Sequence, residues 1–286
     1  MTAIASGSDY IVGYRAESVF GTFEDSAGAF TPLVPVTNVK TSFMKDILES
    51  KGIGFNYVQA NQYGKEEATV SLEGELTDSF MAFAYTILAA TEAGYSIWVK
   101  DSTASVNYKI SGCRPSKLKL STSAGEVVKL TFELSCTKAT TGAVSTSTLA
   151  APSAITPINW SLTSVTPGGS LNATITGYSS WEISLDYGVM KKFGFVATTP
   201  RRIQRTGYAV SGKITSDFED LNQLTDFLNG DQGTLVFNFD TGATLGAGYD
   251  ALTVFGVRYE NIDLDIKPWD LVELPLSFKG TTAVFG

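Results

Sequence analysis

The sequence contains no histidine among its 286 residues. Histidine is the commonest general base and the commonest metal ligand, so the usual acid–base and zinc chemistry lacks its main donor. Two cysteines alone cannot build a structural zinc site, and no CxxC pair, P-loop, GxSxG or dinucleotide fingerprint occurs. Adjacent carboxylates at Glu66 and Glu67 are more typical of a solvated turn than of a glycosidase pair. The sequence therefore predicts a protein that is not an enzyme and uses no metal and no cofactor.

Long apolar runs are also missing. No stretch approaches the roughly 20 residues that a membrane helix needs, which predicts a protein with no membrane partner. The N-terminus lacks the basic start and apolar stretch of a signal peptide, so we expect the chain to be made and kept in a cytoplasm. The net charge of −8 and the isoelectric point near 4.7 disfavour a protein that grips nucleic acid by neutralising phosphates.

What is present indicates a folded protein rich in strands. The apolar fraction is 43% and the charged fraction 17%, which is typical of a globular chain. Aromatic residues make up 12% and there are 27 glycines, a composition that favours strands and turns.

One stretch of the sequence occurs twice. GCRPSKLKLSTSAGEVVKLTFEL (112–134) aligns without a gap on GVRYENIDLDIKPWDLVELPLSF (256–278). The matched pairs are Gly112 with Gly256, Arg114 with Arg258, Leu118 with Ile262, Leu120 with Leu264 and Leu130 with Leu274. Both stretches alternate apolar and polar residues, so each predicts an amphipathic hairpin.

The repeat extends upstream of the hairpin. VKTSF (39–43) matches WEISL (181–185), and 70–90 matches 209–230 with Gly74 over Gly212. Each copy predicts a strand that runs into a short helix. The first helix has Thr77 or Asp78 as its cap and an apolar stripe at Phe80, Phe83 and Ile87; the second has a capping box at Ser216 and Glu219 and a stripe at Phe218, Leu221, Leu224 and Leu228.

These patterns predict a mainly β protein made of two tandem copies of a β-sandwich or barrel with one flanking helix. The first copy covers residues 1–150 and the second 151–286. Between them, 137–157 is rich in Thr, Ser, Ala and Pro, and is either a flexible linker or a crossover packed along its own domain.

The first hairpin also bears on the two cysteines. Pairing Leu120 with Val128 keeps all apolar residues on one face and makes 123–125 the loop, with Gly125 in the left-handed region. In that register Cys113 and Cys136 point to opposite faces, and only a bulge at Arg114–Pro115 would bring them together. We therefore expect two free thiols, as in a reducing compartment.

Two long loops of the repeat differ in charge. The first carries Glu66 and Glu67, and the matching one carries Arg201, Arg202 and Arg205, with Glu67 aligned on Arg205. Two unrelated solvated loops would also explain this, but alternating copies in a ring would bring the opposite charges together, so these five residues are candidate contacts between subunits.

The start GYRAESVFGTF (13–23), the closing hairpin with its preceding glycine and the strand–helix unit resemble the tail tube proteins of long-tailed phages and related viruses, of the type whose domain is duplicated in one chain. The resemblance implies a structural virion protein of the tail, assembled in the host cytoplasm. It implies homotrimeric rings with pseudo-sixfold symmetry that stack into a hollow tube, contact other tail proteins and let DNA pass as a transient passenger. Lys117 and Lys119 depart from a uniformly acidic lumen, whereas the same face of the second copy carries Asn261, Asp263 and Asp265. The lysines therefore either point outward or alternate with acids around the pore. The alternatives are a tube subunit of a secretion or injection machine, and a tandem β-sandwich module that binds sugar or a surface receptor.

Overall fold

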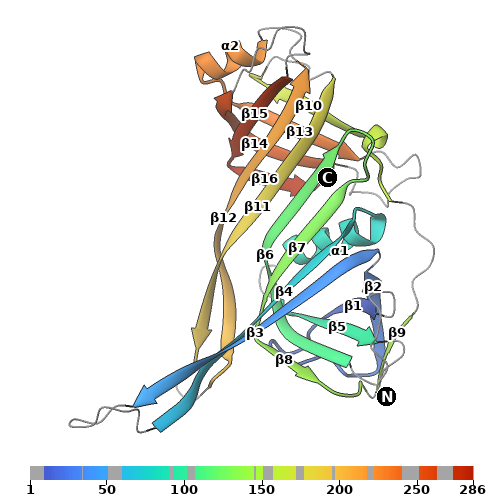
Figure 1. Ribbon diagram of the computed structural model, residues 1–286, viewed down its shortest axis with the longest axis vertical. Coiled ribbons are helices and arrows are strands. Elements are labelled where there is room, and N and C mark those ends of the chain that lie inside the picture. The colour runs from blue at the N-terminus through green and yellow to red at the C-terminus, as the bar shows by residue number, and fades with distance from the viewer. Residues whose placement is uncertain are drawn as a thin grey trace.

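The computed structural model describes residues 10–33, 35–50, 60–89, 93–101, 107–144, 146–150, 157–171, 177–194, 197–217, 222–239, 251–262 and 273–285. Over these residues the protein is built almost wholly of strands, with two α-helices (Figure 1). The mainly β fold class predicted from the sequence is confirmed.

The N-terminal half holds strands β1 to β9 and helix α1. Their bounds are β1 (Tyr10–Ala16), β2 (Gly28–Leu33), β3 (Val36–Ser50), β4 (Ala60–Glu75), α1 (Asp78–Ala89), β5 (Tyr95–Asp101), β6 (Asn107–Ser123), β7 (Lys129–Cys136), β8 (Lys138–Thr141) and β9 (Ser147–Leu149).

The C-terminal half holds strands β10 to β16 and helix α2. Their bounds are β10 (Thr163–Gly169), β11 (Tyr178–Phe193), β12 (Pro200–Asp217), α2 (Asn222–Asn229), β13 (Gly233–Phe239), β14 (Ala251–Ile262), β15 (Glu273–Gly280) and β16 (Thr282–Phe285), preceded by a 3-10 turn at Trp160–Leu162.

Each half is organised around one long strand that belongs to two layers. In the first half, β6 pairs with β5 near its start and with β7 near its end; in the second, β14 pairs in the same way with β13 and then with β15. Apolar side chains fill the space between the layers, because alternate residues of a strand point to the same face. Trp181, for example, lies 5.3 Å from Phe237 and 5.9 Å from Phe239 between ring centroids.

Helix α1 closes the first sandwich. The Phe80 amide donates to the Thr77 hydroxyl over 3.4 Å, so Thr77, one of the two predicted candidates, is the cap. The predicted stripe at Phe80, Phe83 and Ile87 is fully buried, and the Phe83 ring lies 5.2 Å from the Phe132 ring of β7. The helix is therefore held by its apolar face.

The capping box predicted for helix α2 is not formed. Ser216 belongs to β12 and pairs with Leu274 of β15, so the predicted capping box is wrong. The physical reason is that the β12–β15 ladder continues to Asp217 and uses the backbone groups that a helix start would leave unpaired. Leu228 is 72% exposed, so it is not part of a core stripe; Phe218 and Leu221 lie outside the described residues.

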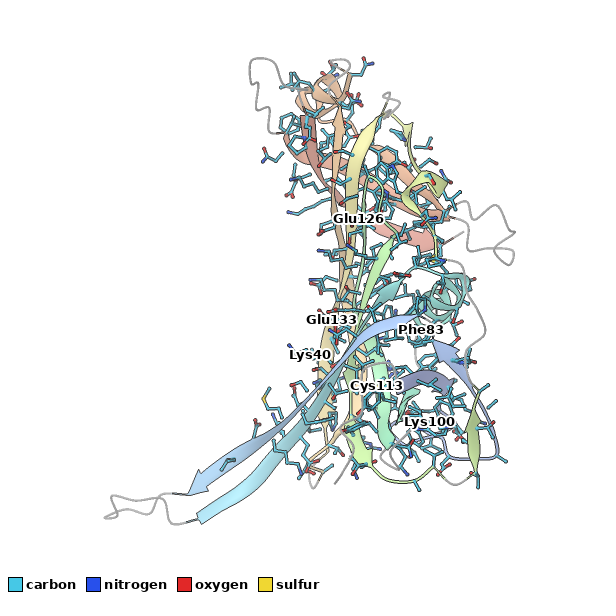
Figure 2. The ribbon with its side chains drawn as sticks, turned by 45° about the vertical axis from the view of Figure 1, so that its right-hand side comes forward. Lys40, Phe83, Lys100, Cys113, Glu126 and Glu133 are labelled. Atoms are coloured by element: carbon cyan, nitrogen blue, oxygen red, sulfur yellow. A yellow bond between two sulfur atoms is a disulfide. The ribbon has the colours of Figure 1, made fainter. Side chains whose placement is uncertain are left out.

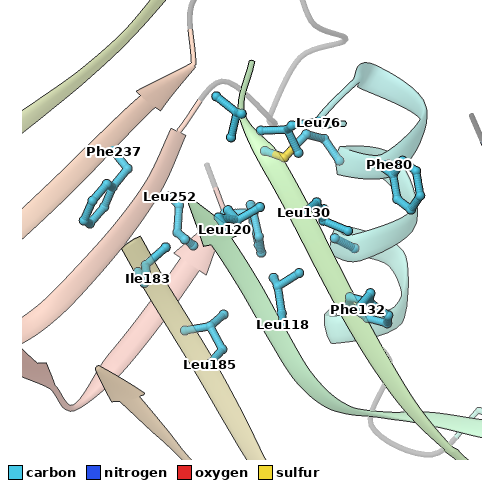
Figure 3. Close-up of a cluster of buried hydrophobic side chains, with 14 of the residues drawn as sticks. Leu76, Phe80, Leu118, Leu120, Leu130, Phe132, Ile183, Leu185, Phe237 and Leu252 are labelled. Carbon is cyan, nitrogen blue, oxygen red and sulfur yellow. The ribbon is translucent and has the colours of Figure 1, made fainter. Parts of the chain in front are cut away.

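The two halves share one sheet. The C-terminal part of β6 pairs with the N-terminal part of β11, with Leu118 opposite Leu185 and Leu120 opposite Ile183. Strand order therefore runs without a break through β3-β4-β7-β6-β11-β12-β15-β14. Figure 3 shows the leucines of β6 beside Ile183 and Leu185, with Leu130 and Phe132 on the neighbouring strand. We call the β6–β11 pairing the seam.

The register of the first hairpin is two residues away from the predicted one. Leu120 lies opposite Leu130, not Val128, although the same face remains buried. The Glu126 amide donates to the Ser123 carbonyl over 3.0 Å and closes a turn in which Gly125 has φ of +83°. The left-handed conformation of Gly125 is confirmed. Trp269 and Pro268 of the second hairpin lie outside the described residues.

The predicted free thiols are also wrong. Cys113 and Cys136 form a disulfide. A bulge between Pro115 and Lys117 puts one extra residue into β6. The residues of β6 that precede the bulge therefore face β7 in a register shifted by one residue. Arg114 consequently lies opposite Ser135, and the two cysteines come together next to that pair.

The same local geometry occurs at both members of the hairpin repeat. Gly112 has φ of +63° and Gly256 of +64°, and each sits in an irregularity of the ladder with the preceding strand. The Thr137 amide donates to the Ser111 carbonyl over 3.0 Å, and the matched Thr281 amide donates to the Phe255 carbonyl over 2.8 Å. The bulge after Pro115 recurs after Tyr259.

The upstream alignment of Gly74 with Gly212 does not agree with the ladders. Gly74 lies opposite Leu130, whereas the residue opposite Leu274, the match of Leu130, is Ser216. Gly212 lies opposite Phe278, four residues further along β15. The strands VKTSF and WEISL do match, since Val39 pairs with Leu72 as Trp181 pairs with Ile214. The two β4 and β12 sequences are therefore shifted by four residues from the alignment based on glycine.

The segment after β7 packs against strands of the first half. β8 pairs with β6, and β9 pairs in parallel with β2. Over 138–144 and 146–149 these pairings agree with the crossover interpretation, and 145 and 151–156 lie outside the described residues.

Candidate functional site

The described residues contain no group of three or more Cys, Asp or Glu side chains placed to hold a metal ion, and no described helix is long and apolar enough to cross a membrane. The most extensive feature of the molecule is instead the polar face of the shared sheet, together with the strands at its two ends.

Charges on this polar face alternate in sign. Lys119 forms an ion pair with Glu182 across the seam, with 2.7 Å between Nζ and Oε2. Lys117 lies between Glu133 of β7 and Asp186 of β11 in the ladder. Both Lys117 and Lys119 thus lie on the polar face of the sheet, next to acidic residues. The positions between the charges are small and polar, among them Ser71, Ser121, Thr131, Ser184, Ser211 and Ser277.

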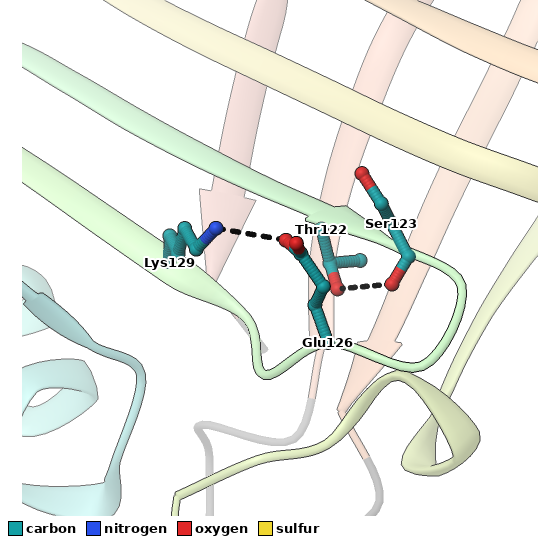
Figure 4. A network of polar contacts seen from close by, with 4 residues as sticks. All are labelled: Thr122, Ser123, Glu126 and Lys129. Atoms are coloured by element: carbon teal, nitrogen blue, oxygen red, sulfur yellow. Dashed lines mark hydrogen bonds and ion pairs between the residues drawn. The ribbon is translucent and has the colours of Figure 1, made fainter.

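The turn of the first hairpin, whose Glu126–Lys129 ion pair is shown in Figure 4, extends the seam. The Ala124 amide donates to the Ser179 carbonyl over 2.8 Å, which continues the β6–β11 ladder by one bond. Glu126 pairs with Lys129 at 2.8 Å and the Thr122 hydroxyl lies 3.5 Å from the Ser123 carbonyl. Each half therefore contributes backbone as well as side chains to the seam.

The sheet ends at β3 and at the C-terminal part of β14, and each of these two stretches has one described strand partner. β3 pairs with β4, and β14 beyond Val257 pairs with β15. β3 and β4 run out from the body as a two-stranded arm (Figures 1 and 2). On β3, Phe43, Met44 and Ile47 are 52%, 59% and 61% exposed. Large apolar side chains on a strand at a sheet edge are typical of a surface that another chain covers.

The predicted acidic residues pair within the chain. Glu66 forms an ion pair with Lys45 of β3 and Glu67 forms one with Lys191 of β11, both at 2.8 Å. The Glu66 amide donates to the Thr198 carbonyl over 2.7 Å. The acidic segment thus contacts the second half through Lys191. Lys191 could not be selected from the sequence, because it comes close to Glu67 only when β6 and β11 pair at the seam.

The predicted arginines have different surroundings. The Arg205 guanidinium donates to the Leu88 carbonyl near the C-terminus of α1 over 3.1 Å, and it lies 5.4 Å from the centroid of the Tyr187 ring. Arg201 and Arg202 are exposed on β12. With the corrected strand alignment Glu67 no longer matches Arg205; Glu67 pairs with Lys191, and Arg205 donates to the Leu88 carbonyl.

The N-terminal motif 13–23 holds the bulge at Gly112. A carboxylate oxygen of Glu17 accepts bonds from the Gly112 amide at 2.6 Å and the Ser96 hydroxyl at 3.0 Å, and the other oxygen accepts the Gly21 amide at 2.7 Å. Burial raises the pKa of Glu17 above its usual value, against these hydrogen bonds. The motif therefore anchors the start of the chain on the point where β6 passes between layers.

Glu24 is the second buried acid of this region. It accepts hydrogen bonds from the Ser26 hydroxyl, the Ser18 amide and the Ser18 hydroxyl. These bonds, that from Ser26 first, lower the pKa of Glu24 from 4.5 to about 2.

A protein-family model described as phage tail tube protein matches residues 7–279. The chain belongs to the phage tail tube protein family. No curated protein matches it. As a tail tube protein it is a structural component of the virion tail that assembles with itself and with other tail proteins, and such proteins are typically not enzymes. The predicted family resemblance is confirmed.

Proposed function

We propose that this tail tube protein forms rings of three chains, each contributing two copies of one domain (1–150 and 151–286), and that the rings stack into a hollow tail through which the genome leaves. The observation that carries the proposal is the shared sheet, in which the two halves already join edge to edge through Leu118, Leu120, Ile183 and Leu185. If the same edge-to-edge join also forms between chains, the interface is heterologous, that is, head to tail. Such an interface closes into a ring when the rotation from one chain to the next allows it.

Matched local geometry supports the duplication. Gly112 and Gly256 share a left-handed conformation, and Thr137 and Thr281 make the same backbone hydrogen bond. Two copies per chain give pseudo-sixfold symmetry from three chains, with the same number of domains that six single-domain chains would supply.

The polar sheet face is the surface we assign to the lumen. Its cations lie beside acids, as in the Lys119–Glu182 pair, so it offers no uncompensated row of positive charge to phosphates. With a net charge of −8, the protein repels DNA weakly, and DNA passes as a transient passenger. Assembly takes place in the host cytoplasm and needs no membrane.

Contacts between rings or between chains include the five residues selected from the sequence. Glu66 and Glu67 act there as parts of the pairs with Lys45 and Lys191. Arg201 and Arg202, exposed on β12, bind carboxylates of a neighbour through their planar guanidinium groups.

Two measurements test the proposal. Negative-stain microscopy of the purified protein should show rings or hollow rods, and native mass spectrometry should give a ring of three times the 30.5 kDa chain. Strictly monomeric particles at high concentration would favour a binding module. Six chains per ring would retain the tube but remove the trimer. A tube subunit of an injection machine differs in cargo, so DNA inside the tails of virions that carry this protein would decide between the two tubes.

A further inference from the structure

We propose that the bond between Cys113 and Cys136 forms late: the chain folds and assembles as a dithiol, and oxidation after it leaves the reducing cytoplasm locks the first half of each subunit. The inference rests on the proposed function, which places assembly in the host cytoplasm. It adds a redox step that acts on the finished tube.

The disulfide joins the two layers of the first half. Cys113 lies on β6 before the bulge and pairs with Tyr95 of β5, while Cys136 ends β7 and pairs with Ala68 of β4. β5 and β1 form one layer, and β4 and β7 belong to the shared sheet. Cys113 is labelled in Figure 2 on the body of this half. The bond therefore ties the layers together at the point where β6 passes from one to the other.

The second half makes the same junction without a covalent bond. Cys113 matches Val257 in the gap-free alignment of the hairpin repeat, and the same offset matches Cys136 to Gly280. Val257 pairs with β13 and Gly280 with β12, so these two residues also lie in different layers. A Cβ atom built at Gly280 would lie 2.4 Å from Cγ1 of Val254, so close packing holds this junction. The fold thus forms the junction without a disulfide, and the bond of the first half is an addition to it.

The buried site also accommodates two thiols. Both cysteines are 0% exposed and belong to the main apolar core, where a thiol behaves as a small apolar group. The Leu134 carbonyl oxygen lies 3.9 Å from the Cys136 sulfur. In the dithiol form the Cys136 S–H group donates a weak hydrogen bond to that oxygen. Reduction therefore leaves no strongly polar group unpaired in the core.

The cysteine content suits oxidation after assembly. The sequence contains no cysteine besides Cys113 and Cys136. Copies packed closely in a tube thus have no exposed thiol through which oxidation would join them, and the bond within the chain is the one available. Cytoplasmic reductants keep protein thiols reduced, whereas disulfides persist outside the cell. The change of compartment therefore sets the time at which the bond forms.

The oxidant is a low-molecular-weight disulfide. One cysteine, as its thiolate, attacks a sulfur of that disulfide and displaces the first small thiolate, which leaves a mixed disulfide on the protein. The thiolate of the other cysteine then attacks the sulfur of the first cysteine and displaces the second small thiolate. The protein loses two electrons and two protons, and the oxidant gains both as two small thiols. Because both sulfurs are buried, the exchange takes place during local opening and is slower than in the unfolded chain.

Thiol counting in the full chain tests the order of events. The protein is produced in a reducing cytoplasm, the cells are lysed in denaturant with N-ethylmaleimide, and the intact mass is measured. We expect two labels per chain at lysis. Tubes purified under reductant and then treated with oxidised glutathione should take no label and keep their shape by microscopy. They should also unfold at a higher guanidinium concentration than untreated tubes, because the bond restricts the unfolded chain.

The outcomes separate this inference from the proposed function. No label at lysis would overturn it, because the bond would then form on folding. Dithiol protein that assembles only after oxidation, or treated tubes that still take two labels, would overturn it as well. Absence of rings in both redox states would count against the proposed function, while the label counts on the monomer would still decide when the bond forms.

A matched control is provided by the second half itself. Cys113→Val with Cys136→Gly installs the residues of the second junction in the first. This variant should assemble like the dithiol protein, and its guanidinium midpoint should not respond to oxidised glutathione. A midpoint shift as large as that of the unmodified protein would contradict the proposal, because the oxidant would then act elsewhere. A variant that does not fold would contradict the equivalence of the two junctions, and the label counts on the unmodified chain would still decide the order of events.

Discussion

Gly112 and Gly256 occupy the same backbone conformation, with φ of +63° and +64°, at matched positions of the two halves. A Cβ atom at Gly112 would collide with the side chain of Thr137, and one at Gly256 with that of Thr281. Two independent reasons thus favour glycine at each position: the left-handed φ and the close approach of a threonine side chain.

The first prediction concerns this pair of requirements. Gly112→Ala should destabilise the protein by more than the roughly 1–2 kcal/mol of left-handed backbone strain, because the methyl group also meets Thr137. Adding Thr137→Ala should recover part of the loss, as measured by chemical denaturation of the single and double variants. Equal stability of the two variants would show that the collision does not contribute.

Gly125 provides a case without the collision. No atom lies within 4 Å of a Cβ built there, so Gly125→Val should cost about 1–2 kcal/mol through its φ of +83° alone. Gly125→Asn should cost less, since asparagine tolerates the left-handed region. A thermal midpoint for Gly125→Val equal to that of the unmodified protein would contradict the turn.

The third prediction concerns the disulfide. Cys113 and Cys136 are separated by 23 residues, and a cross-link of that span stabilises by about 3 kcal/mol in the chain-entropy description. Reduction should therefore lower the unfolding midpoint. The double variant Cys113→Ala/Cys136→Ala should not respond to reductant. Two reactive thiols in protein that is unfolded without reductant would show that the bond is absent.

The fourth prediction separates the arginines. Arg205→Glu should lower stability by about 1–3 kcal/mol, because it removes the bond to the Leu88 carbonyl near the C-terminus of α1. Arg201→Glu with Arg202→Glu should leave the fold intact and block assembly, which in the unmodified protein should weaken as salt rises. Melting curves and sedimentation measure the two effects. Normal tubes from the double reversal would remove these residues from the contact.

The fifth prediction follows from Glu24. Its pKa in the folded state, about 2, lies below the ordinary 4.5, so the folded protein favours the carboxylate. The stability that it contributes is present above pH 4.5 and is lost as the pH falls toward 2. Glu24→Gln should therefore be less stable than the unmodified protein at neutral pH, and the difference should shrink through that window.

Glu17 is the comparison, because its pKa is shifted the other way. A raised pKa means that the contribution of Glu17 is present below its ordinary pKa and is lost as the pH rises through the folded value. The stability difference between Glu17→Gln and the unmodified protein should then change with pH in the opposite sense. The same pH trend in both variants would contradict the two assignments.

Features that depend on neighbours along the chain could be predicted without the structure. Alternation of apolar residues predicts β6 and β7 and their buried face, the spacing of Phe80, Phe83 and Ile87 predicts α1, and the turn chemistry predicts Gly125. The hairpin repeat predicts that Gly112 and Gly256 share a role. Each of these follows from periodicity or from the conformational freedom of one residue.

The tertiary structure decided the features that depend on register between distant strands. One extra residue at the bulge after Pro115 brings Cys113 to Cys136, and the seam brings Glu67 to Lys191. The β12–β15 ladder extends through Ser216 and overrides its capping signal. Strand pairing between remote segments is fixed by the sum of many cross-strand contacts, and a shift by two residues keeps the same side chains on the same face. Alternation in the sequence therefore cannot distinguish such registers, and only the packed core selects one.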